Sequence, residues 1–275
     1  MTAFLAEYGT LILALAACGL FSGLVAGLFG IGGGAVIVPV LFFLFSGLGY
    51  EDTAQHVAVA TSLATIVLTS ARSVMAHHKR GAVDWGVLKT WSPWIVLGAA
   101  LGTIVAGQLD GQVLTLLFSL IAFVLAAQLF FGRPGWRLAE DVPGGAVRAG
   151  LGSGMGALSA LMGIGGGTFG VTLLTVCGRT MHVAVATGAG FGIAIGAPAA
   201  LTALFTGQGV EGLPPFSVGY VNVAAFALIS VFTVLMAPIG AKLAHALDAA
   251  KLKKAFSILL AIVAVRMLWS VIGAG

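Results

Sequence analysis

The sequence predicts an all-α polytopic membrane protein that consists of two inverted-topology repeats, each with five helical segments. Three observations predict this class: an apolar composition, basic residues confined to alternate loops, and a duplicated glycine-rich motif. Hydrophobic residues make up 59% of the chain and charged residues 8%, whereas a soluble domain carries about 25% charged residues. We therefore expect the lipid bilayer to be the solvent, and the net charge of +4 does not indicate nucleic-acid binding.

Apolar segments follow one another along the chain. The uncharged stretches are 8–50, 53–71, 90–109, 112–132, 149–178, 180–210, 212–241 and 255–275, the last interrupted by Arg266. A membrane span needs about 20 apolar residues, so most stretches are predicted to be single helices and 8–50 to hold two. No basic region precedes the first apolar segment, so we expect a retained span rather than a cleaved signal peptide.

The stretch 149–178 is broken by glycines and fits either one or two segments, and the loop charges decide between these interpretations. If this stretch and 8–50 each form two segments, ten segments result and every basic loop lies on one side. Those loops contain Lys79, Arg80, Arg133, Arg137, Arg148, Arg179, Lys242, Lys251, Lys253 and Lys254. The opposite loops contain Glu51, Asp52, Asp110 and Glu211. The positive-inside rule then predicts a bacterial inner-membrane protein with both termini outside.

The two halves of the chain carry the same landmarks in the same order. GIGGG at 30–34, the first glycine motif, recurs at 163–167 as the second glycine motif, and HVAVAT at 56–61 recurs at 182–187. Because five segments is an odd number, the second half must enter the membrane in the opposite orientation. The predicted units are a first repeat over 1–131, a cytoplasmic linker over 132–147 and a second repeat over 148–275. Each repeat contains a glycine-broken pair of helices, and charge leaves open whether these pairs span the bilayer fully or form re-entrant hairpins.

Two long segments of the chain resemble the sulfite exporter family TauE/SafE, also called the toluene sulfonate uptake permease family. They are GLVAGLFGIGGGAVIVPVL in the first half and GALSALMGIGGGTFGVTLL in the second, each followed by a helix that starts at HVAVAT. The resemblance covers nearly the whole chain and both halves. It implies transport of sulfite, sulfoacetate or a similar organosulfonate, commonly as export, while some relatives are linked to other substrates.

The glycine motifs are the first candidate binding site. Inverted repeats are typical of secondary transporters, whose sites lie near the midplane where helices are broken. A break in each motif exposes unpaired backbone N–H groups at the start of the next helix, and two helix N-termini that face one point can bind an anion without a charged side chain. The candidate residues are Gly32, Gly33, Gly34, Gly165, Gly166 and Gly167. The alternative role of these glycines is tight helix packing.

Hydroxyl groups form a second set of candidates. Thr61 and Thr187 lie five residues into the HVAVAT helices, about 7.5 Å toward the midplane. Ser62 extends the polar run in the first half, and Gly188 replaces it in the second. These hydroxyls can donate to a sulfonate oxygen, or they can bond to a carbonyl one turn earlier in their own helix.

Three ionisable side chains complete the candidate site. His56 and His182 open the HVAVAT helices and are candidates for gating or proton coupling, with a role as interfacial anchors or caps as the alternative. Arg72 lies inside a polar-poor helix, where it can attract an anion or extend to the headgroups.

The sequence predicts a secondary transporter that exports a small sulfur-containing anion by alternating access. Every Asp and Glu falls at a segment end, so no buried acid for ion coupling is predicted. An anion that leaves a negatively charged cell gains about 2.3 kcal/mol per charge at 100 mV, so uncoupled efflux is sufficient. The alternatives are a channel-like anion facilitator, a permease for another small organic anion, and a subunit of a larger assembly. The chain contains neither GxSxG nor HExxH, so we predict no enzyme, no metal and no other cofactor.

Overall fold

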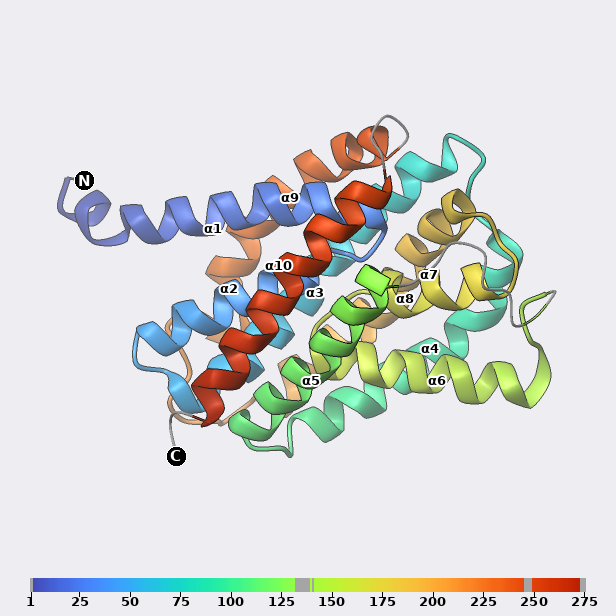
Figure 1. Ribbon diagram of the computed structural model, residues 1–275. Helices are drawn as coiled ribbons and strands as arrows, with labels where there is room; N and C mark the ends of the chain where they lie inside the picture. The colour runs from blue at the N-terminus through green and yellow to red at the C-terminus, as the bar shows by residue number, and fades with distance from the viewer. Residues whose placement is uncertain (1, 132–138, 140, 245–248, 273–275) are drawn as a thin grey trace.

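The computed structural model describes the backbone of residues 2–131, 139, 141–244 and 249–272. This part of the chain forms ten α-helices and one short β-hairpin (Figure 1). They are α1 (Thr2–Phe29), α2 (Gly34–Gly47), α3 (Glu51–His78), α4 (Trp85–Ala106), α5 (Gly111–Phe131), α6 (Gly145–Met162), α7 (Gly167–Val176), α8 (Met181–Thr206), β1 (Ser217–Val218), β2 (Val221–Asn222), α9 (Val223–Leu243) and α10 (Ala249–Ile272). The predicted all-α class is confirmed, and seven of the described helices are long and apolar enough to cross a membrane.

Helices α2 and α7 are the two short apolar helices that follow the glycine motifs. Their 14 and 10 residues correspond to lengths of about 21 and 15 Å, less than the roughly 30 Å of a bilayer core. Neither can span the membrane alone, so each glycine-broken pair consists of a longer helix and a half-helix. Half of the predicted linker, residues 132–138 and 140, lies outside the described residues.

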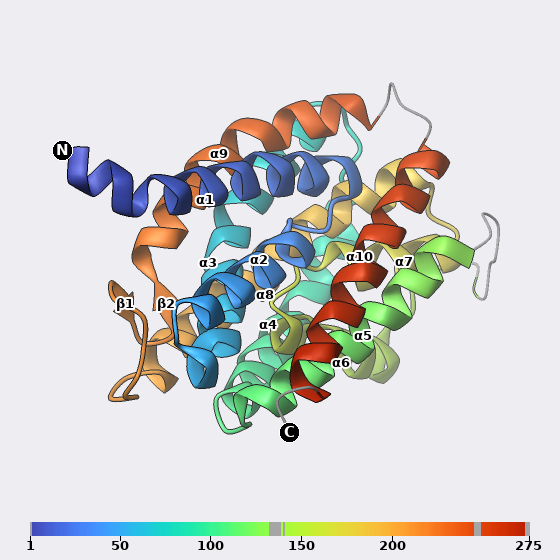
Figure 2. The same cartoon turned by 60° about the vertical axis from the view of Figure 1, so that its left-hand side comes forward.

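Helices α3 and α8 pack against each other at the centre, and α3 is the most buried of the seven candidate spans. Around them α1 packs against α9, α4 against α6, and α5 against α10 (Figures 1 and 2). In the first two pairs, the first helix of one half packs against the fourth helix of the other half: α1 against α9, and α6 against α4. A two-fold repeat would produce this arrangement, and the inverted repeat itself stays a prediction.

Apart from the two glycine motifs, the described helix connections lie toward two opposite ends of the molecule (Figures 1 and 2). At one end the turn after α3 meets the turn before α8, through an ion pair between Asp84 and Arg179. At the other end Thr53 at the start of α3 donates to the Gly212 carbonyl oxygen in the connection before α9. The arginine-containing end corresponds to the predicted cytoplasmic side, and the orientation in the membrane stays a prediction.

Glycines set the close spacing of the outer helix pairs. A Cβ atom at Gly156 of α6 would overlap the Ile95 carbonyl oxygen of α4, and one at Gly98 of α4 would overlap the Ser153 carbonyl oxygen of α6. In membranes, small residues at such crossings allow the backbones to approach and form extensive van der Waals contacts. The α4–α6 pair therefore depends on glycine at these two positions.

Replacing Gly156 by alanine is expected to lower the free energy of unfolding by about 1–3 kcal/mol, because the new methyl group overpacks the α4–α6 interface. Gly154→Ala is the matched control on the same helix, since its Cβ would meet no atom within 4 Å. The control should be neutral or stabilising by up to about 1 kcal/mol, because alanine favours the helix. Unfolding of the detergent-solubilised variants measures both effects, and equal losses would contradict the assigned interface.

Candidate functional site

The two glycine motifs lie in direct backbone contact at the centre of the protein. A Cβ atom at Gly34 would overlap the carbonyl oxygen of Gly163, and one at Gly167 would overlap the carbonyl oxygen of Gly30. A Cβ atom at Gly165 would lie 3.2 Å from the Cα atom of Gly32. Four of the six predicted glycines, Gly32, Gly34, Gly165 and Gly167, thus contact the other motif, while Gly33 lies against Ser22 and Gly166 against Phe191.

Backbone conformation gives a second reason for glycine. Gly33, the residue before α2, has φ +81°, and Gly163, the residue after α6, has φ +65°. Both values lie in the left-handed region, which residues with a Cβ atom adopt at a cost. The turns between the paired helices therefore depend on glycine for their geometry as well as for their contact.

Most backbone N–H groups of these motifs are unpaired, whereas those of Gly30, Gly163 and Ile164 bond to the end of the preceding helix. Residues 31–35 and 165–168 are buried, and within the described part of the chain their N–H groups have no hydrogen-bond acceptor. Neither α2 nor α7 has a side chain that caps its N-terminus. Helix N-termini carry partial positive charge and attract anions. The site can therefore donate several hydrogen bonds to an anion from both halves.

The two candidate threonines make equivalent contacts with the opposite half of the chain, which we name the cap contacts. The hydroxyl oxygen of Thr61 accepts a hydrogen bond of 2.9 Å from the backbone N–H of Asn222, the residue before α9. The hydroxyl oxygen of Thr187 accepts one of 3.0 Å from the backbone N–H of Asp84, the residue before α4. Each threonine thus contacts the N-terminus of a helix from the other half, and neither bonds back to its own helix.

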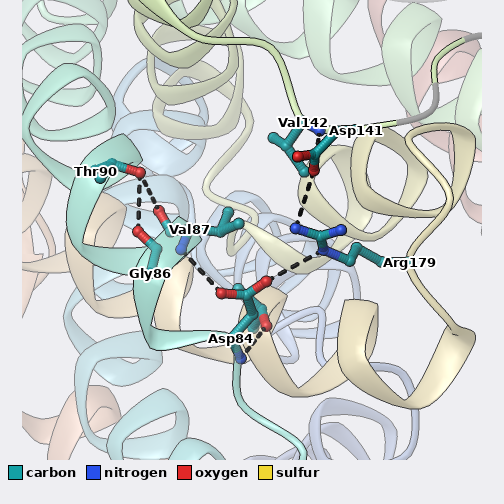
Figure 3. Close-up of polar contacts among 8 residues, drawn as sticks. Asp84, Gly86, Val87, Thr90, Asp141, Val142 and Arg179 are labelled. Atoms are coloured by element: carbon teal, nitrogen blue, oxygen red, sulfur yellow. Dashed lines mark hydrogen bonds and ion pairs between the residues drawn. The ribbon is translucent and has the colours of Figure 1, made fainter.

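The cap residues themselves differ in charge. Asp84 Oδ1 accepts from the Val87 N–H at 3.0 Å, and Asn222 Oδ1 accepts from the Ala225 N–H at 3.0 Å, so both residues cap their helices. Only Asp84 continues into ion pairs (Figure 3): its Oδ2 lies 3.1 Å from Arg179 Nε, whose Nη2 lies 3.0 Å from Asp141 Oδ1. The ion pairs at the start of α4 therefore connect three parts of the chain: Asp84 in the first half, Asp141 in the predicted linker and Arg179 in the second half.

The other first-half candidates are buried and bonded. Ser62 donates a hydrogen bond of 2.7 Å to the carbonyl oxygen of Gly163, which ties α3 to the second glycine motif. His56 Nε2 lies 2.9 Å from the carbonyl oxygen of Leu109, so this nitrogen carries the proton and donates. Its ring also stacks on Tyr220, with centroids 5.0 Å apart, and burial raises the pKa of the Tyr220 phenol.

Two candidates lie away from this centre. Arg72 has an exposed side chain on α3, and His182 is exposed at the start of α8. His182 therefore does not share the buried position of His56, although both open an HVAVAT helix. Among the described residues no cluster of three or more metal-ligating side chains occurs.

Sequence analysis did not identify the cap residues or their ion pairs. Asp84 and Asn222 each precede an apolar run, which is a signal for a helix N-cap. Asp84 follows Thr61 in the first half, and Asn222 follows Thr187 in the second. The sequence separation is longer in the second half because a β-hairpin, which ends at Asn222, comes after α8. The equal roles of these residues become visible only in the tertiary structure.

Comparisons with known proteins give a consistent result. Residues 15–267 match the family model described as sulfite exporter TauE/SafE. A "Probable membrane transporter protein" of Haemophilus influenzae is 32% identical over 94% of this chain and 98% of its own length. Another of that description from Methanocaldococcus jannaschii is 26% identical over 95% and 97%, and YunE of Bacillus subtilis is 29% identical over 40% and 38%. No solved structure matches the chain.

Replacing Asp84 tests the charged cap contact. Asp84→Ala removes the N-cap bond and the ion pair, so we expect the free energy of unfolding to fall by about 1–2 kcal/mol. Asp84→Asn retains a capping oxygen, as Asn222 does, and should lose only about 0–1 kcal/mol, because the ion pair is partly exposed. The free energy of unfolding is measured at low and high salt, because added salt should reduce the contribution of the ion pair and not that of the N-cap hydrogen bond. Equal losses in both variants would contradict the capping role.

Proposed function

The chain belongs to the sulfite exporter TauE/SafE family, and on this basis we propose that it exports sulfite or a small organosulfonate such as sulfoacetate. The protein is a multi-pass membrane transporter, and its named relatives are membrane transporters rather than enzymes. The proposal concerns the substrate, the direction of transport and the binding site. In this proposal the two glycine motifs bind the substrate, and the protein exports it across the bacterial inner membrane by alternating access.

The observation that carries the proposal is the set of unpaired backbone N–H groups in the two motifs. Buried N–H groups without acceptors are rare, because each lost hydrogen bond costs free energy. Two buried runs of them, 31–35 and 165–168, belong to motifs in contact. A sulfite or sulfonate group offers three oxygen atoms that can accept from both runs at once.

The contacts around the motifs also support an anion held by neutral donors. The atoms nearest to the motif glycines belong to backbone or to uncharged side chains such as Ile66, Ser22 and Phe191. A neutral site binds an anion without a strong ion pair, and moderate binding favours release on the other side. Arg72 is exposed, so we assign it at most an indirect, electrostatic part in attracting the substrate.

Charge distribution supports export without a coupling ion. Among the residues whose side chains the structure describes, Asp and Glu lie in helix connections or in the first turn of a helix, such as Glu51, Asp52 and Asp110. The membrane potential supplies about 2.3 kcal/mol per charge at 100 mV for an anion that leaves the cell. Efflux therefore needs no buried carboxylate.

The two cap contacts support alternating access rather than an open channel. Thr61–Asn222 and Thr187–Asp84 each join the two halves of the chain, and they lie in opposite halves of the antiparallel α3–α8 pair. Loss of one contact while the other stays formed would open the protein on one side only. A channel-like facilitator and a permease for another small organic anion are the competing functions.

Purified protein in proteoliposomes tests the proposed function. We expect saturable efflux of sulfite or sulfoacetate above that of empty vesicles, and stimulation by substrate on the opposite side, because alternating access couples the two directions. Flux equal to empty vesicles would refute the substrate assignment. Flux that neither saturates nor responds to substrate on the opposite side would favour the channel-like facilitator.

Replacing Gly166 by leucine tests the site itself. The new side chain would start 2.5 Å from the Cβ atom of Phe191, so we expect the motif contact to be displaced and efflux to fall to the level of empty vesicles. Gly154→Leu is the control, since Gly154 is exposed and has free space around it. Both variants are compared as equal amounts of monodisperse protein. Wild-type flux in Gly166→Leu would contradict the assignment of the motifs to substrate binding.

A further inference from the structure

Helix α3 carries a line of buried polar residues, which we name the polar stripe: Gln55, Ser62, Ser70 and Ser73. Successive members are seven, eight and three residues apart, which places them on one side of a helix with 3.6 residues per turn. The exposed fraction of each is 2% or less. In a helix that only packs against apolar helices, such a stripe would contribute no stability, because its polar groups would find no hydrogen-bond partners.

Three of these four residues lack hydrogen-bond partners. Within the described part of the chain, Gln55 has no partner at Nε2 or at Oε1, and the hydroxyl groups of Ser70 and Ser73 have none. The neighbouring threonines of α3 behave differently, since Thr65 and Thr69 donate to carbonyl oxygens one turn earlier. The lack of partners therefore distinguishes Gln55, Ser70 and Ser73 from these other buried polar residues of the helix.

Unpaired buried polar atoms are costly, and more so in a membrane protein, where the unfolded segment finds few polar partners in the bilayer core. The amide of Gln55 alone can make up to four hydrogen bonds. Polar residues inside membrane proteins commonly line a substrate pathway or a water-filled cavity. The stripe is thus expected to meet a polar partner in another conformation of the protein.

The stripe passes the glycine motifs. Ser62 bonds to Gly163 of the second motif, and the side chain of Ile66, one turn further along, lies 3.1 Å from a Cβ built at Gly32 of the first motif. Gln55 lies before this point along α3, toward the end that contains the α8–α9 connection. Ser70 and Ser73 lie beyond it, toward the end that contains Arg179.

Helix α8 faces part of this stripe with glycine. The hydroxyl group of Ser70 lies so close to Gly192 that a Cβ atom there would overlap it. Gly196, one turn along α8, similarly lies against the Leu63 carbonyl oxygen of α3. Since no α8 side chain fills these positions, a small displacement of α8 from α3 would open space beside the serine hydroxyl groups.

We propose that the polar stripe lines the anion's route on both sides of the glycine motifs. The Gln55 amide donates hydrogen bonds to the anion at one end of the route, and the Ser70 and Ser73 hydroxyl groups donate at the other. The substrate class is a small oxyanion, because all of these groups are neutral donors of the kind that replace water around sulfite or sulfonate oxygens. This inference extends the proposed function, since it names the side chains that contact the anion outside the central site.

Cysteine accessibility tests the route without measuring transport. In a Cys18→Ala/Cys177→Ala background, each of Gln55→Cys, Ser70→Cys and Ser73→Cys is treated with the membrane-impermeant anionic reagent 2-sulfonatoethyl methanethiosulfonate. We expect labelling about tenfold faster than at a buried control site, because conformations that open the route expose these thiols to water. Both sides of the proteoliposome membrane are exposed to the reagent in separate experiments.

The matched control is Ser119→Cys in α5. Ser119 is 1% exposed, like the stripe residues, but its hydroxyl group donates to the Thr115 carbonyl oxygen at 2.8 Å. Equal labelling at the control and at the three stripe positions, whether fast or slow, would overturn the proposal. Labelling at only one end of the stripe would also overturn it, because a continuous route requires both ends.

Flux measurements separate this inference from the proposed function. Gln55→Leu and the double variant Ser70→Ala/Ser73→Ala are expected to reduce efflux about tenfold, and Ser119→Ala to leave it unchanged. Wild-type efflux in the stripe variants, with unlabelled stripe cysteines, would refute the route and leave the exporter assignment intact. Selective labelling of the stripe in a protein that moves neither sulfite nor sulfoacetate would keep the route and refute the substrate.

Discussion

At the centre of the protein the Gly30 carbonyl oxygen lies against Gly167, and the Gly163 carbonyl oxygen lies against Gly34. This contact between two backbones fixes where α1, α2, α6 and α7 end or begin, because any side chain at these positions would separate the motifs. Within the described part of the chain it also leaves the N–H groups of residues 31–34 and 165–167 buried and without an acceptor. The same constraint thus accounts for the half-helices and underlies the proposed anion site.

The cap contacts lie in opposite halves of the antiparallel α3–α8 pair. In one half Thr61 bonds to the neutral cap residue Asn222, and in the other Thr187 bonds to Asp84, which also pairs with Arg179. The two hydrogen bonds have similar lengths, but only the Asp84 contact continues into an ion pair, so added salt is expected to weaken only that contact. A transporter that opens one end at a time benefits from closures that can break independently.

The ten segments and the glycine motifs could be predicted because hydrophobic length, loop charge and sequence repetition are local properties of the chain. Side-chain roles could not. The sequence predicts that Thr61 and Thr187 donate to substrate or to their own helix. It does not reveal that their hydroxyl oxygens accept hydrogen bonds from cap residues of the opposite half, and their contact with substrate stays a prediction. Gln55 lies among ordinary helix residues in the sequence, and only its burial without partners makes it a candidate. Such roles depend on packing between distant segments, which one sequence does not reveal.

The central claim is that the paired glycine motifs bind a small sulfur oxyanion, and thermal unfolding in the presence of anions tests it most directly. Sulfite, sulfoacetate, taurine, thiosulfate, sulfate and chloride are titrated into the purified protein, with Gly32→Ala and Gly154→Ala in parallel. The account predicts that sulfite or sulfoacetate raises the unfolding temperature with the logarithm of its concentration in the wild type and in Gly154→Ala, and not in Gly32→Ala. Stabilisation by no sulfur anion, or equal stabilisation of Gly32→Ala, would contradict it.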